Sequence, residues 1–210
     1  MTGTSAQSSA ADPVTVLDFW WEAGREAWFT RSDAFDADIR SHFVPLMDDA
    51  ASGALDHWQE TPHGALALLL LLDQFPRNVY RQDKRAFARD AKAQIIATAA
   101  LARGFDKAFP KDARAFFYLP FEHAEDMAQQ EKSVDLFRRL GDKEFYLYAL
   151  VHLDVIRRFG RFPHRNHVLE RETTPEEAAY LADGGFLPET RVCHSISLEW
   201  FSSSGMPPLP

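Results

Sequence analysis

The feature that most constrains the fold is an unbroken apolar run from Ala65 to Leu72, inside a longer helical pattern. Thr61 and Pro62 precede it, and Thr at an N-cap followed by Pro at the first helical position is a common way to begin a helix. The run has no polar side, so the helix that carries it must be covered on every face. It is far shorter than the roughly 20 residues that span a bilayer. We therefore predict that it forms the central buried helix of a soluble domain.

Helix signals continue on both sides of this central segment. Asp12-Pro13 and Ser32 are suited to begin two earlier helices, and Pro45 is expected to bend or shorten the second. Beyond the leucines, further helices are expected over residues 83–103, 112–140 with a break near Pro120, and 143–159. The sequence therefore predicts an all-α fold of about seven to nine helices in antiparallel hairpins.

The chain of 210 residues suits one large helical domain with two tails. Residues 1–12 are small and polar, and we expect them to be disordered. The single helical domain is expected over residues 13–186. Residues 187–210 have only a weak strand-like alternation and are predicted to form an irregular C-terminal extension.

Charge and cysteine content exclude several classes of function. The net charge is −8, with a pI near 5.5, and an acidic chain is poorly suited to nucleic acid because phosphate contacts need clustered Lys and Arg. Cys193 is the single cysteine, so no internal disulfide can form and a reducing compartment is indicated. The first residues have no basic and apolar signal pattern. We expect a cytoplasmic protein with neither a nucleic-acid nor a membrane partner.

The segment RRFGRFPHRN, residues 157–166, gathers basic and polar side chains in this acidic chain. It ends a helical stretch in Phe-Pro and then Arg-Asn, as residues 65–78 do, which predicts two buried helices that each leave through a rigid Phe-Pro turn. Helix-end chemistry accounts for Arg77 and Asn78 in the first copy. The second copy has four arginines, which one helix end cannot use. Acidic neighbours, solvent or a bound anion must offset their repulsion.

A third polar segment, FFYLPFEHAED, lies at residues 116–126. Glu122 and Glu125 are three residues apart and would share a helical face, whereas His123 points elsewhere. His152 lies in an apolar stretch, where a histidine is more often a hydrogen-bonded core residue than a catalytic one. If Glu122 or Glu125 faces His152, the pair could carry out general acid–base chemistry. The common metal, nucleotide and nucleophile motifs are absent, so we expect no metal and no cofactor.

These segments resemble a known family. LDQFPRNVYR (72–81), FYLPFEHAED (117–126), RFGRFPHRN (158–166) and the opening VLDFWWEAG are similar to the bacterial domain-of-unknown-function family numbered 924, over roughly residues 14–186. The resemblance implies a tetratricopeptide-like stack of helical hairpins. It implies no established activity. Motifs built from Arg, His, Asn and Glu are unusual for a plain helical scaffold, so the resemblance favours a shared polar pocket.

Two hypotheses follow from these residues. In the first, the polar segments converge within about 10 Å around a concave pocket that binds a small anionic molecule, with acid–base catalysis as an added role. The catalytic candidates are His123, Glu122 and His152. The ligand-binding candidates are Asp73, Arg77, Asn78, Tyr118, Glu125, Arg158, Arg161, His164, Arg165 and Asn166. In the second, the chain is a protein or peptide interaction module with a wide groove lined by Trp and Tyr, and the same polar residues are structural ion pairs.

Overall fold

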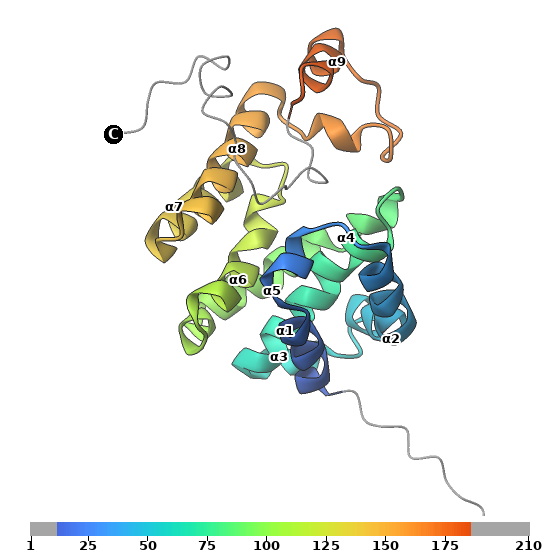
Figure 1. Ribbon diagram of the computed structural model, residues 1–210. Helices are drawn as coiled ribbons and strands as arrows, with labels where there is room; N and C mark the ends of the chain where they lie inside the picture. The colour runs from blue at the N-terminus through green and yellow to red at the C-terminus, as the bar shows by residue number, and fades with distance from the viewer. Residues whose placement is uncertain (1–11, 186–210) are drawn as a thin grey trace, which may run out of the picture.

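The computed structural model describes residues 12–185, and every regular element in that range is helical (Figure 1). The α-helices are α1 (Pro13–Phe29), α2 (Asp33–Ser52), α3 (Pro62–Leu69), α4 (Phe75–Val79), α5 (Asp90–Ala102), α6 (Lys111–Glu122), α7 (Met127–Leu140), α8 (Lys143–Phe159) and α9 (Pro175–Ala182). The shorter elements are η1 (Asp56–Glu60), η2 (Leu70–Gln74), η3 (Lys84–Ala86), η4 (Phe105–Ala108) and η5 (Pro163–Arg165). The all-α prediction is confirmed, while the predicted C-terminal extension lies outside the described residues. None of the described helices is both long and apolar enough to cross a bilayer.

Side-chain caps begin the first two helices where the sequence indicated, and a further cap begins α9. The Asp12 side chain accepts a hydrogen bond from the backbone of Val14, and Ser32 caps α2 through the N–H of Phe35. At the start of α9, Thr174 and Glu177 form a reciprocal capping box. These local bonds fix where each helix begins, and tertiary packing then selects which face is buried.

The leucine helix is central, as predicted. All residues from Ala65 to Leu72 are at most 1% exposed, and α3 packs against α1, η1, α5 and α6. The aromatic side chains of the first third of the chain cover this helix, with Trp20 and Phe75 fully buried in the same core. An apolar segment of this length gains its stability from being enclosed by other helices rather than from facing water on one side.

Helix boundaries differ from the sequence prediction at three places. Helix α2 runs through Pro45 without ending, because the buried Phe43 and Met47 on either side of the proline hold that face in the core. The helix expected from residue 83 begins only at Asp90, after the short element η3. The break expected near Pro120 falls after Glu122 instead, where Asp126 caps a new helix, α7, through the N–H of Gln129.

The leucine helix does not leave through a Phe-Pro turn. It passes through the π-helical segment η2, in which the N–H of Phe75 bonds to the carbonyl of Leu70, and continues as α4 to Val79. Pro76 lies at the start of α4, directly after the π segment. Arg77 is therefore on a helix, and π segments of this kind are frequent at functional sites. The second Phe-Pro does leave the helix, because α8 ends at Gly160 before η5.

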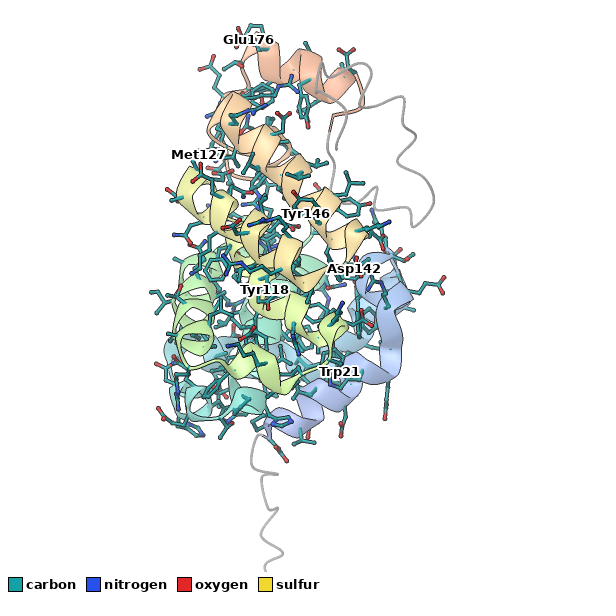
Figure 2. The ribbon with its side chains drawn as sticks, turned by 90° about the vertical axis from the view of Figure 1, so that its left-hand side faces the viewer. Trp21, Tyr118, Met127, Asp142, Tyr146 and Glu176 are labelled. Atoms are coloured by element: carbon teal, nitrogen blue, oxygen red, sulfur yellow. The ribbon has the colours of Figure 1, made fainter. Side chains whose placement is uncertain are left out.

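The second half of the chain is a stack of neighbouring helices. Helix α7 packs against both α6 and α8, and the loops between them are only a few residues long, so consecutive helices run antiparallel. In Figure 2, α7 and α8 lie side by side, with Asp142 near the turn that joins them and Glu176 of α9 at the far end. A small second cluster of Val155, Ile156, Phe162 and Tyr180 joins α8 to α9.

Candidate functional site

A cavity of about 330 Å³ lies where the polar segments of the sequence meet. Its walls come from the C-terminal end of α1, from η2 and α4, from the region around η3, from the end of α6, from the middle of α8, and from η5. Six of the residues proposed from the sequence line it: Arg77, Asn78, His123, His152, His164 and Arg165. The two Arg-Asn segments, far apart in the chain, therefore contribute arginines to the same cavity.

His123 and Asp73 form a hydrogen-bonded pair at this cavity. Nδ1 of His123 lies 2.8 Å and 3.0 Å from the two carboxylate oxygens of Asp73, which is almost fully buried. An ionised carboxylate can only accept hydrogen bonds, so Nδ1 carries the proton and Nε2 carries the lone pair. Asp73 lies in the π segment η2 and His123 is the C-cap residue of α6, so the pair joins these two elements.

The charge states of the pair follow from burial and from Arg77. Burial alone would raise the pKa of Asp73, but Arg77 and His123 outweigh it and hold that pKa at about 2. Burial, together with the positive charge of Arg77, lowers the pKa of His123 to about 4, although Asp73 opposes the shift. At neutral pH the pair is therefore a carboxylate beside a neutral imidazole, which is the form that can accept a proton.

Arg77 is already committed to carboxylates. Its guanidinium lies 3.0 Å and 2.9 Å from the two oxygens of Asp90, and 3.0 Å from Asp73. Arg81 makes a similar two-point contact with Asp36, at 2.6 Å and 2.9 Å, and Asn78 donates to the same carboxylate. Arg77 was a candidate for binding the anion, but a bidentate contact with an external anion does not fit this geometry, because Asp90 occupies that position.

Arg165 differs from the other arginines. It is 6% exposed, yet its closest carboxylate oxygen, on Asp90, is 3.8 Å away. Its Cζ lies 4.5 Å from the ring centre of Phe87 and 4.4 Å from that of Phe162. Its guanidinium donates no hydrogen bond to any residue in the range 12–185, and the buried Nε is without a partner there. Burial first, and then Arg77, lower its pKa to about 10 against the pull of Asp90.

A second histidine stands beside the first. Nδ1 of His152 lies 2.8 Å from the carbonyl oxygen of Tyr148 and 3.3 Å from Oε1 of Glu122, which is fully buried. The ring centres of His152 and His123 are 6.2 Å apart. Of the two glutamates considered for His152, the structure brings Glu122 to it, because α6 ends before Glu125 and turns that residue away.

The other proposed residues lie away from the cavity and hold its walls. Arg161 and Asn166 both bind Glu177 of α9, while Glu125 binds Arg171 and the backbone N–H of Phe162. These contacts anchor the segment that carries His164 and Arg165. Two residues have other roles: the hydroxyl of Tyr118 donates to Asp106, and Arg158 contacts the rings of Phe159 and Tyr180.

Sequence reasoning missed much of the cavity wall. Trp28, Phe29, Phe87 and Leu119 supply its apolar surface, and Asp90 neutralises Arg77. The motif Trp28-Phe29 follows Gly24, where α1 kinks with φ of 76°, and this glycine was the available signal. In the part of the chain that the structure describes, no group of three or more His, Cys, Asp or Glu side chains could hold a metal ion.

The fold and cavity define an all-helical protein with a buried arginine and a histidine–aspartate pair at one site. Comparison with known proteins assigns the chain to a family: it belongs to the family described as bacterial protein of unknown function, DUF924, whose model matches residues 16–185. It is similar to the solved structure of a protein of unknown function from Agrobacterium tumefaciens, with 46% sequence identity and a TM-score of 0.80, over 82% of this chain and 97% of that one. No curated protein matches.

Proposed function

We propose that the protein binds a small anionic molecule in this cavity, in the cytoplasm, with Arg165 as the anchor. The observation that carries the proposal is the buried guanidinium of Arg165, which makes no hydrogen bond to a described residue and has its closest carboxylate 3.8 Å away. Burying a cation costs several kcal/mol unless it is closely paired. An anion that donated two oxygens to this guanidinium would supply the missing pairing.

The shifts in pKa favour an anion over a cation as the ligand. The pKa of Arg165 falls to about 10, that of His123 to about 4 and that of His164 to about 3, in each case with burial as the largest cause and Arg77 among the others. Burial disfavours charge of either sign, but the contribution of Arg77 specifically disfavours added positive charge at this place. A negative ligand lowers that contribution, whereas a cation would increase it.

The His123–Asp73 pair gives the site a chemical function in addition to binding. Asp73 fixes the ring of His123 with Nε2 as the proton acceptor, in the arrangement that hydrolytic and isomerising enzymes use for general bases. His152, supported by Glu122, lies next to it and is suited to the complementary transfer. We propose that a ligand held by Arg165 exchanges a proton with His123.

The alternative is an interaction module in which the arginines are structural. The close pairs of Arg161 with Glu177, at 2.7 Å, and of Arg171 with Glu125, at 2.6 Å, support it for those residues. A module of this kind needs a wide groove lined by Trp and Tyr. The cavity of about 330 Å³ has Trp28 but no Tyr in its wall, and it suits a small molecule better than a peptide.

A thermal-shift screen against small carboxylates, phosphates and amino-acid derivatives tests the proposal. A ligand at about 100 times its dissociation constant should stabilise the fold by about 2.7 kcal/mol, which is roughly 5–10 °C for a chain of this size. The shift should disappear in Arg165→Met and persist in Arg158→Met, a matched control on the same segment. No shift with any anion, or a shift that Arg165→Met retains, would contradict the proposed function.

A further inference from the structure

Four donor side chains at the cavity are already engaged with carboxylates, and this restricts which anion fits. Arg77 and Arg81 direct their guanidinium groups at Asp90 and Asp36. The side-chain amides of Gln74 and Asn78 donate to Asp73 and Asp36. A phosphate dianion is normally held by several donors at once, and these four side chains are already engaged with carboxylates.

The geometry of Arg165 suits a planar group with one charge. Phe87 and Phe162 contact the guanidinium of Arg165 in the way that aromatic rings stack on its flat face. The N–H groups of a guanidinium lie in its plane, so its edge is where a ligand would accept hydrogen bonds. A carboxylate pairs with such an edge through two parallel hydrogen bonds. Asp73 and Asp90 lie nearby and would repel a second negative charge, while the lone pair on Nε2 of His123 cannot donate to it.

Part of the wall is apolar and aromatic. It consists of Trp28, Phe29, Ala86, Phe87, Leu119 and Val168, while Thr30, Arg31 and Gln82 add polar side chains to the same cavity. A cavity of about 330 Å³ is near the lower end of the range for small-molecule sites, so a single ring with a short chain would fill it. A small, highly charged metabolite would leave this wall without contacts.

We infer that the ligand is an amphipathic monocarboxylate, with its carboxylate on Arg165 and an apolar or aromatic body against Trp28, Phe29 and Phe87. The inference rests on the proposed anion site and narrows it to one chemical class. It excludes phosphate esters and polycarboxylates as the preferred ligands, and it places the body of the ligand where His123 can reach it.

Isothermal titration with four probes tests this class: 3-phenylpropionate, phenyl phosphate, citrate and the uncharged 3-phenylpropionamide. We expect 3-phenylpropionate to bind at least tenfold more tightly than each of the others. Arg165→Met should weaken its binding at least tenfold and Arg158→Met should leave it unchanged. Val168→Trp keeps Arg165 and places a larger side chain at a half-buried position in the cavity wall, so it should also weaken the binding of 3-phenylpropionate. This variant replaces Arg165→Met in the test if Arg165→Met does not fold.

The outcomes separate this inference from the proposed function. Tighter binding of phenyl phosphate or citrate, lost in Arg165→Met, would overturn the monocarboxylate class and leave the anion site in place. Equal binding of 3-phenylpropionate and its amide would overturn the carboxylate–arginine contact. If none of the three anions bound, both the inference and the proposed anion site would be wrong.

Discussion

Nδ1 of His123 lies 2.8 Å from Oδ1 of Asp73, although the two residues are 50 positions apart in the chain. The contact joins the π segment that follows the leucine helix to the end of α6, and both residues are buried. Because an ionised carboxylate fixes the proton on Nδ1, this contact leaves Nε2 as the imidazole nitrogen that can accept a proton.

The first prediction concerns the tautomer of His123. Nitrogen-15 NMR of the folded protein at pH 7 should show Nδ1 protonated and Nε2 unprotonated. In Asp73→Asn the amide can donate to Nδ1, so a larger share of the other tautomer is expected, with a loss of about 3 kcal/mol of stability from the broken buried pair. A wild-type ring with its proton on Nε2 would contradict the proposed base.

Stability should depend on pH because two buried histidines resist protonation. The pKa of His123 is lowered to about 4 and that of His164 to about 3, whereas an unfolded chain binds these protons near pH 6.5. The stabilising contribution is therefore complete above pH 6.5 and is lost as the pH falls toward the folded values, by up to about 1.4 kcal/mol per pH unit for each histidine.

Urea unfolding at pH 7, 6 and 5 measures that loss. The loss of stability per pH unit should be smaller in His123→Gln and in His164→Gln than in the wild-type protein. A wild-type free energy of unfolding that rises as the pH falls from 7 to 5 would be the wrong sign for this account.

A third prediction compares how much Arg161 and Arg158 contribute to the stability of the fold. Arg161 holds Glu177 with two hydrogen bonds, at 2.7 Å and 2.9 Å, so Arg161→Ala should destabilise the fold by removing both and leaving Glu177 with only Asn166 and the backbone N–H of Thr174 as donors. Arg158→Ala removes a half-exposed side chain and should cost less than about 1 kcal/mol. Chemical denaturation of both variants checks the difference. Equal losses of unfolding free energy would argue against the role of Arg161 in holding α9 in place.

The fourth prediction tests whether Arg165 stabilises the fold. Arg165→Met replaces a poorly paired buried cation with an apolar chain of similar length, and Asp90 keeps Arg77, so the free energy of unfolding should stay within about 1 kcal/mol of wild type or rise. Arg165→Ala also loses packing against Phe87 and Phe162, and should cost about 2–3 kcal/mol. A loss above 3 kcal/mol in Arg165→Met would favour a structural arginine and the interaction-module alternative.

Much of the fold was predictable because its signals are local. The apolar run of α3 could only be central, and Ser32, Thr61 and the pair Thr174–Glu177 cap helices within three residues of themselves. Proline positions were less informative. Pro45 and Pro120 lie inside helices, since packing of their buried neighbours outweighs the lost hydrogen bond.

The site was predictable only in part, because pairing between distant residues leaves no local pattern. The motifs identified Arg77, His123 and Arg165 as residues that would meet. They could not show that Asp90 occupies the guanidinium of Arg77 while Arg165 lacks a close partner in the described chain. Whether an arginine is paired depends on distances of a few tenths of a nanometre between side chains of different helices. The expected anion contact therefore falls to Arg165 alone and not to Arg77 and Arg165 together.

A co-crystal structure with 3-phenylpropionate tests the central claim most directly. The account predicts both carboxylate oxygens within about 2.7–3.2 Å of guanidinium nitrogens of Arg165, with the ring against Trp28 and Phe87. The same crystals of Arg165→Met should show no ligand in the cavity. A carboxylate bound elsewhere, or a cavity that remains without ligand in the wild-type protein at saturating concentration, would contradict the assignment of Arg165 as the anion anchor.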